Sequence, residues 1–254
     1  MTGEIDLNYL SRKSGARIAY KQNQGNGPTL IWCGGLKSDM EGGKAVHLHE
    51  WASRENRNFI RFDYFGHGKS SGRFRDGTIS QWADDVTFVM DELSKGAVIL
   101  IGSSMGGWAA LMASMKRSAR VKGLLLIAPA PDFTQKLTWE YWTEEQRQTL
   151  IDDGIVYVES DYDEPYEYSQ ILMEDGRANQ ILDKSIAFLG PVKILQGAMD
   201  TVVPWEYSKQ ILDLITSEDV DYTLVKNGDH SLSSPIDLKR LVSTAEDLCR
   251  QIES

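Results

Sequence analysis

Short apolar runs rich in β-branched residues alternate along the chain with segments of helical periodicity. The apolar runs predict buried strands at residues 29–33, 58–63, 97–102, 121–128, 192–197 and 220–226. The amphipathic segments predict helices at about 40–56, 78–95, 105–118, 204–217 and 235–252. This alternation is typical of a parallel sheet that helices cover on both faces.

The opening of the chain follows a different pattern. Polar and apolar positions alternate from Ile5 to Asn23, and Ser14-Gly15 provides a turn within this stretch. We expect an antiparallel hairpin at the edge of the sheet. With the six buried strands, the hairpin gives an eight-stranded, mostly parallel sheet in a single domain of residues 1–254.

Residues 132–190 interrupt this rhythm, because they contain no convincing buried strand. They combine many acidic side chains with a set of aromatic ones, namely Trp139, Tyr141, Trp142, Tyr157, Tyr162, Tyr166 and Tyr168. A connection of this length inside a compact domain calls for a structural reason. We expect a helical cap, or lid, inserted between two core strands; an irregular surface excursion is the alternative.

Composition and charge narrow the class of protein. The chain has 37 acidic and 27 basic residues, a formal net charge of −10. A field of that sign repels nucleic acid and anionic membranes, so we expect no nucleic-acid partner. No apolar run approaches the roughly 20 residues of a membrane span, and the first residues lack the basic and apolar regions of a signal peptide. These features favour a cytoplasmic protein and leave its oligomeric state open.

One motif indicates the chemistry most clearly. Residues 102–106, GSSMG, directly follow a predicted strand and precede an apolar helix. A nucleophilic serine at such a junction sits on a strained turn, so the residues two positions away on either side have to be small. Glycines occupy these positions around Ser104, whereas Ile101 and Met105 occupy them around Ser103. The motif therefore predicts Ser104 as the nucleophile.

Serine is a weak nucleophile at neutral pH, so a base has to accept its proton. Where the nucleophile follows a strand in this way, the histidine comes later in the chain, and His230 is the only histidine downstream of Ser104. It lies in a turn-rich loop after the last predicted strand. His47 and His49 form an H-x-H pair without an apparent third ligand, and His67 belongs to a loop that needs no catalytic explanation.

The acid that orients the histidine has three candidates. Asp200 is preferred, because its loop follows a predicted strand and lies at the same sheet edge as the loops of Ser104 and His230. Asp132, which follows the preceding strand, and Asp229, next to the histidine, are the alternatives. The role of this acid is to hold the imidazole in one tautomer and to stabilise the imidazolium.

Acyl transfer also needs donors for the developing oxyanion. We expect the backbone N–H of Met105, at the start of a helix, and that of Leu36, in the loop after strand 29–33. Cys33 ends that strand and is an alternative nucleophile, but its apolar neighbours are typical of a buried thiol. Cys33 and Cys249 show no metal-ligand spacing.

Residues 61–70, RFDYFGHGKS, fit the loop pattern R-x-D-x-x-G-x-G-x-S of the α/β-hydrolases. The chain resembles this superfamily and, within it, the family of a mitochondrial palmitoyl-protein thioesterase and its bacterial relatives. Further matching segments are GLKSDM at 35–40, GSSMGGW at 102–108, VPW at 203–205 and DVDY at 219–222. The resemblance covers roughly residues 15–250. It implies an esterase or thioesterase that acts on acyl groups of small molecules or of proteins and that uses neither a metal nor an organic cofactor.

Two other classes of function stay open at this point. The same fold supports further serine chemistry, such as hydrolysis of C–C bonds or perhydrolysis without a cofactor. A ligand-binding scaffold that retains the fold is the alternative outside enzymes, because fold alone does not define function.

Overall fold

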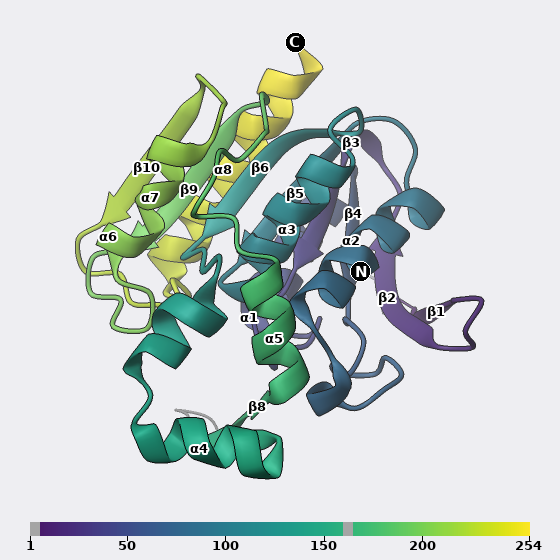
Figure 1. Ribbon diagram of the computed structural model, residues 1–254. Helices are drawn as coiled ribbons and strands as arrows, with labels where there is room; N and C mark the ends of the chain where they lie inside the picture. Colours follow the sequence, from purple (N-terminus) through teal and green to yellow (C-terminus); the bar gives the residue numbers. More distant parts are fainter. Residues whose placement is uncertain (1–5, 160–164) are drawn as a thin grey trace.

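The computed structural model describes residues 6–159 and 165–254, so Ile5 and Tyr162 lie outside the described residues. Its main element is an eight-stranded sheet with the strand order β1-β2-β4-β3-β5-β6-β9-β10 (Figure 1). The strands are β1 (Asn8–Ser11), β2 (Arg17–Asn23), β3 (Asn26–Cys33), β4 (Arg57–Phe62), β5 (Val98–Ser103), β6 (Val121–Ile127), β9 (Val192–Gly197) and β10 (Val220–Val225). β2 runs antiparallel to β1 and β4, and the other neighbouring strands are parallel. The predicted α/β fold with a mostly parallel sheet is confirmed.

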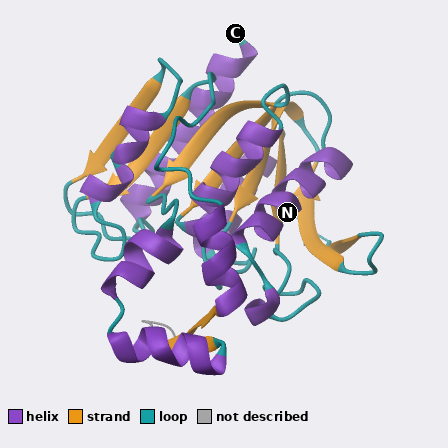
Figure 2. Cartoon of the chain, viewed as in Figure 1, coloured by secondary structure: helices purple, strands orange, loops and turns teal. Residues whose placement is uncertain are grey.

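Helices cover both faces of this sheet (Figure 2). They are α1 (Gly43–Arg54), α2 (Ile79–Leu93), α3 (Met105–Lys116), α6 (Trp205–Ser208), α7 (Gln210–Leu214) and α8 (Pro235–Glu253). In the view of Figure 1, α3 lies in front of the sheet and α8 behind it. The single helix predicted at 204–217 is divided into α6 and α7 at Lys209.

Alternate residues of the central strands face opposite layers of the core. Leu30 and Trp32 of β3 belong to the apolar cluster that includes α1 and α8. Ile31 and Cys33 belong to the cluster that includes α2 and α3. Because both faces of the strand are buried, every position has to be apolar, which explains the uninterrupted hydrophobic runs in the sequence.

Residues 132–190, called the insertion below, lie between β6 and β9 at the carboxyl ends of the strands (Figure 1). Their elements are η2 (Thr134–Thr138), η3 (Trp139–Tyr141), α4 (Glu144–Asp153), β7 (Ile155–Val158), β8 (Tyr166–Ser169) and α5 (Gln170–Ala178). β7 and β8 form a two-stranded antiparallel sheet that the sequence analysis did not predict. Strands of four residues are too short for their alternation to stand out. The alternation is nevertheless present, because Val156 is buried and Tyr157 is 53% exposed.

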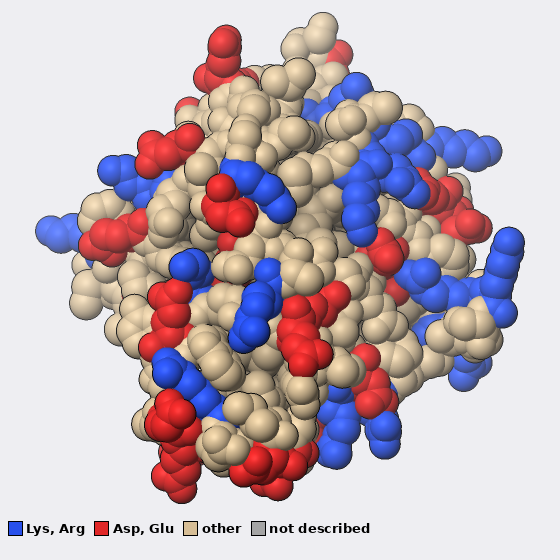
Figure 3. Space-filling model, in the orientation of Figure 1, with Lys and Arg blue, Asp and Glu red and all other residues tan. Residues whose placement is uncertain are grey.

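Acidic and basic side chains both occur on the face shown in Figure 3. Acidic side chains gather at its lower edge, where Figure 1 shows α4. The first turn of α4 contains Glu144 and Glu145, where negative charge interacts favourably with the helix dipole. In the described part of the chain, no helix has the length and apolar character that a membrane crossing requires.

Candidate active site

Ser104 lies at the sharp turn between β5 and α3. Its backbone angles are φ +54° and ψ −120°, a strained conformation for a residue with a side chain. Hydrogen bonds from Ser104 N to Ile127 O (2.9 Å) and from Ala130 N to Ser104 O (3.1 Å) hold the turn against the end of β6. The neighbouring strand therefore maintains the strain and keeps the serine at the sheet edge.

Two glycines make the space for this turn. A Cβ atom on Gly106 would lie 2.1 Å from the carbonyl oxygen of Cys33. A Cβ atom on Gly102 would lie 2.6 Å from the carbonyl oxygen of Gly106. Both distances are far inside van der Waals contact, so only glycine allows the loop after β3 to approach the start of α3 this closely. These close approaches explain why the residues two positions before and after Ser104 have to be small.

Three side chains that are distant in the sequence meet at this edge. His230 Nε2 lies 3.2 Å from Ser104 Oγ, and His230 Nδ1 lies 2.8 Å from Asp200 Oδ2. Because a carboxylate only accepts hydrogen bonds, Nδ1 carries the hydrogen and Nε2 can accept the serine hydroxyl. Ser104, His230 and Asp200 thus form the hydrogen-bonded chain that the sequence analysis expected to find together.

Asp200 is held in one orientation by several donors. Its Oδ1 accepts the backbone N–H groups of Val202 (2.9 Å) and Val203 (2.8 Å). Its Oδ2 accepts Gln196 Nε2 (3.0 Å) in addition to His230. The side chain of Asp200 is 0% exposed, so water does not compete for these bonds. Gln196 was not singled out from the sequence; its one indication there is an amide side chain directly after the apolar pair Ile194-Leu195.

The two alternative acids bind other partners. Asp132 accepts the backbone N–H groups of Ile181 (2.8 Å) and Leu182 (2.8 Å), which ties the start of the insertion to its final part. Burial raises the pKa of Asp132. Asp229 accepts the N–H of Leu232 (2.9 Å), and this bond is the main cause that lowers the pKa of Asp229. Neither has a hydrogen bond to His230 among the described contacts.

Leu36 and Met105, the two residues expected to provide oxyanion donors, both line the pocket beside Ser104. Met105 is the first residue of α3, where the positive end of the helix dipole lies. Among the described residues, neither N–H donates to a protein acceptor. Backbone N–H groups without a protein partner are the kind of donor that can stabilise an oxyanion.

A pocket of about 730 Å³ opens at Ser104, within the usual size range of small-molecule sites. The insertion lines the pocket with Phe133, Leu137, Tyr166 and Tyr168, together with the polar side chains of Thr138 and Glu159. Met199, Val202 and Val203 line the pocket from the loop after β9. The pocket therefore has polar groups near the serine and both apolar and polar side chains in its walls.

Lys44 of α1 lines the polar side of the same pocket. Its Nζ donates to the carbonyl oxygen of Ser231, next to His230. Burial lowers the pKa of Lys44 to about 8, and the nearby charge of Asp229 opposes this shift. The contact fastens the His230 loop to α1; no sequence motif distinguishes Lys44 from other helix lysines.

The remaining candidates from the sequence have structural surroundings. Burial raises the pKa of Cys33 to about 12 and that of Cys249 to about 11, so neither free thiol forms a thiolate nucleophile near neutral pH. His49 is 1% exposed, and its Nδ1 accepts Arg61 Nε (2.9 Å). Within residues 6–159 and 165–254, no group of three or more His, Cys, Asp or Glu could hold a metal ion.

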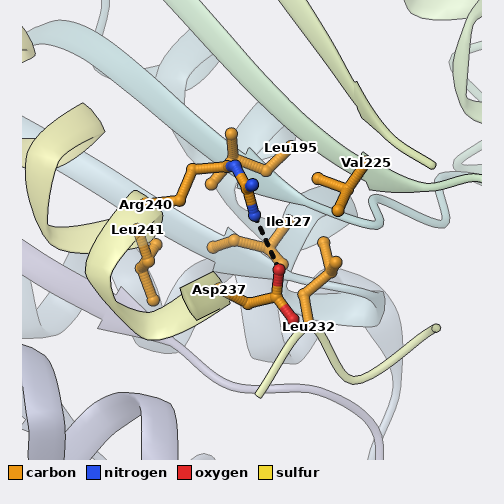
Figure 4. A pocket seen from close by; sticks show the side chains of 7 residues that line it. All are labelled: Ile127, Leu195, Val225, Leu232, Asp237, Arg240 and Leu241. Carbon is orange, nitrogen blue, oxygen red and sulfur yellow. Dashed lines mark hydrogen bonds and ion pairs between the residues drawn. The ribbon is translucent and has the colours of Figure 1, made fainter. Parts of the chain in front are cut away.

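A second cavity lies between the start of α8 and the strands β6, β9 and β10 (Figure 4). It measures about 10 Å³ and is lined by Ile127, Leu195, Val225, Leu232, Asp237, Arg240 and Leu241. Arg240 Nη1 donates to Asp237 Oδ1 (2.6 Å) across it. This volume is about that of one water molecule, so the cavity is a packing gap rather than a ligand site.

Comparisons with known proteins agree with the fold. A sequence model described as the α/β hydrolase fold matches residues 47–159. A putative hydrolase from Agrobacterium vitis S4 has a similar structure, with a TM-score of 0.92 and 38% identity over 97% of this chain and 99% of that one. The α/β-hydrolase domain-containing protein 10 from mouse has a TM-score of 0.89 and 32% identity over 97% and 99% of the two chains. These similarities define the class: an enzyme with the α/β-hydrolase fold.

Sequence identity to curated proteins identifies the family within this class. The mitochondrial palmitoyl-protein thioesterase ABHD10 of Mus musculus is 34% identical, and the match covers 99% of this chain and 85% of that protein. The chain belongs to the family of this ABHD10 thioesterase. It is therefore a hydrolase, as its resemblance to the family predicted.

Proposed function

We propose that the chain is a serine hydrolase that cleaves acyl esters or thioesters through an acyl-enzyme on Ser104. The observation that carries the proposal is the Ser104–His230–Asp200 chain of hydrogen bonds at a pocket with both apolar and polar side chains in its walls. The names of the ABHD10 relatives, palmitoyl-protein thioesterases, support an acylated protein as one substrate. A small-molecule acyl ester or thioester fits the same chemistry.

The reaction follows from the positions of the three side chains. His230 Nε2 accepts the proton of Ser104 Oγ while the oxygen attacks the acyl carbon. The N–H groups of Leu36 and Met105 stabilise the oxyanion that develops, and Asp200 stabilises the imidazolium. His230 then gives the proton to the leaving alcohol or thiol. In the second half, water attacks the acyl carbon and His230 accepts its proton. His230 then gives this proton to Ser104 Oγ as the carboxylic acid leaves.

The insertion acts as a cap over the acyl site in this proposal. Phe133 packs edge-on against Trp108 of α3, with ring centroids 5.8 Å apart. Trp142 packs in the same way on Tyr168, at 5.6 Å. The first contact holds the pocket wall against the core, and the second holds it within the insertion. The cap sets the space for the acyl group and takes no part in the chemistry.

A larger side chain in this wall is expected to shorten the acyl groups that the enzyme accepts. Leu137→Trp should lower kcat/KM for p-nitrophenyl esters of long acids about 10-fold relative to p-nitrophenyl acetate, because the added ring occupies part of the pocket. Ile151→Trp is the matched control, since Ile151 is 63% exposed on α4 and is not a lining residue. An unchanged long-to-short ratio in Leu137→Trp would count against the cap.

The experiment that tests the function is a panel of p-nitrophenyl esters and acyl thioesters of increasing chain length. We expect hydrolysis of several members by the wild-type enzyme and none above background by Ser104→Ala. A wild-type enzyme that binds these compounds without cleaving any of them would contradict the proposal and favour a binding scaffold.

We further propose that the enzyme acts in the cytoplasm. Both cysteines are free and buried, as is usual in reducing compartments. The ABHD10 relatives are mitochondrial by name. Fractionation of the source cells tests the location, and recovery of the enzyme outside the cytoplasmic fraction would contradict it.

A further inference from the structure

We propose that His67 is a positioning residue for oxyanion stabilisation, because it fixes the loop that carries the Leu36 N–H. The inference rests on the proposed function, since it takes Leu36 as an oxyanion donor. His67 lies after β4, and Leu36 lies after β3. The sequence analysis gave His67 no role in the reaction.

Next to Leu36, the two loops are joined by a directed hydrogen bond. The backbone N–H of Lys37 donates to His67 Nε2 at 3.2 Å. Lys37 is the residue directly after Leu36, and its φ of +56° is unfavourable for a residue with a side chain. A turn bond from Ser38 N to Gly35 O (3.1 Å) closes the loop around these two residues. His67 therefore stabilises the one strained residue next to the oxyanion donor.

The tautomer of His67 is defined by its second partner. His67 Nδ1 lies 3.2 Å from the carbonyl oxygen of Phe65, which can only accept. Nδ1 therefore carries the hydrogen, and Nε2 is left as an acceptor for the Lys37 N–H. Burial lowers the pKa of His67 to about 4, so the ring is neutral at physiological pH and keeps this acceptor.

The ring of His67 is held rigidly. It is 4% exposed and packs edge-on against Tyr64, Phe74 and Trp82, with centroid distances of 5.5, 5.2 and 5.1 Å. Such packing leaves the side chain one orientation. Because the ring cannot move, its Nε2 atom holds the Lys37 N–H in one place. A mobile ring would not restrain Lys37 in this way.

The same pair of loops is joined at a second point, farther from the pocket. Asp63 Oδ1 accepts the N–H of Met40 at 2.7 Å, and Asp63 Oδ2 accepts that of Lys69, also at 2.7 Å. Asp63 thus anchors the far end of the loop after β3. His67 restrains the near end, at the residue next to Leu36, which is the part that determines where the oxyanion donor lies.

The test compares variants that keep or remove the acceptor. His67→Phe retains an aromatic ring without an acceptor, and His67→Gln offers an amide oxygen to the Lys37 N–H. For p-nitrophenyl acetate we expect His67→Phe to lower kcat roughly 10- to 100-fold with KM within about 2-fold, because an oxyanion donor acts in the transition state. His67→Gln should restore kcat to within about 5-fold of wild type.

Tyr64→Phe is the matched control. It removes a buried hydroxyl from the same aromatic cluster and leaves the bond between Lys37 and His67 in place. We expect wild-type kcat and KM for this variant. His67→Leu serves as a second variant without an acceptor if the phenylalanine does not fit the cluster.

A readout independent of activity completes the experiment. Hydrogen exchange at the Lys37 amide should be faster in His67→Phe than in wild type, because its acceptor is gone. Wild-type kcat in a folded His67→Phe enzyme, or an equal loss in Tyr64→Phe, would overturn the inference. Unchanged exchange at Lys37 would also overturn it. A wild-type enzyme without any esterase activity would instead contradict the proposed function.

Discussion

Replacing Ser104 with alanine is expected to lower kcat by about 10⁴- to 10⁶-fold, because covalent chemistry and the associated proton transfer are lost together. The fold should be retained, since Ser104 Oγ has only His230 as a partner among the described contacts. The measurement is kcat on one p-nitrophenyl ester, with the thermal midpoint Tm recorded for both proteins. Alanine also leaves the strained turn without a new side-chain clash.

Ser103→Ala is the control for this variant. Ser103 is the neighbouring serine of the same turn and is 7% exposed at the end of β5. We expect Ser103→Ala to keep most of the activity. The reverse result, an active Ser104→Ala and an inactive Ser103→Ala, would show that the motif had been assigned in the wrong register.

Replacing Asp200 with asparagine is expected to lower kcat by about 10⁴-fold. The asparagine fits the same space, but an amide in place of Oδ2 no longer stabilises the imidazolium and favours the wrong tautomer of His230. The backbone donors of Val202 and Val203 can still be satisfied by the remaining oxygen, so the loop should keep its shape. Kinetics on the same ester, together with Tm, measure the effect.

Asp132→Asn is expected to lower the stability of the enzyme while leaving its catalytic rate nearly unchanged. Asp132 accepts two backbone N–H groups of the insertion, and an amide in its place can satisfy fewer of them. We expect a loss of about 1–3 kcal/mol in the free energy of unfolding and kcat within about 5-fold of wild type. A larger loss of kcat in Asp132→Asn than in Asp200→Asn would reverse the assignment of the acid.

The fold could be predicted from the sequence, and so could the residues that meet at the carboxyl edge of the sheet. Buried parallel strands have continuous apolar runs, so the ends of β3, β5, β6 and β9 could be predicted to within three residues, and those of β9 without error. Ser104 was recognisable because the strain of its turn requires glycine at 102 and 106. The order of nucleophile, acid and base along the chain then singled out His230 and favoured Asp200.

What the sequence did not define depends on contacts between distant segments. Lys44 contacts the His230 loop through the tertiary fold, and no local pattern marks it. The bond from Lys37 to His67 joins two loops thirty residues apart, and it depends on a tautomer that only the second partner of His67 determines. The small sheet of β7 and β8 was missed because its strands are four residues long.

Identification of the labelled residue after reaction with a fluorophosphonate probe tests the central claim most directly. The probe reacts with a serine that is activated by a neighbouring base, and the adduct is stable enough for peptide fragmentation to distinguish Ser103 from Ser104. The account predicts one adduct on Ser104 in the wild-type enzyme and none in Ser104→Ala. An adduct on Ser103 or elsewhere, or a folded wild-type enzyme that stays unlabelled, would contradict it.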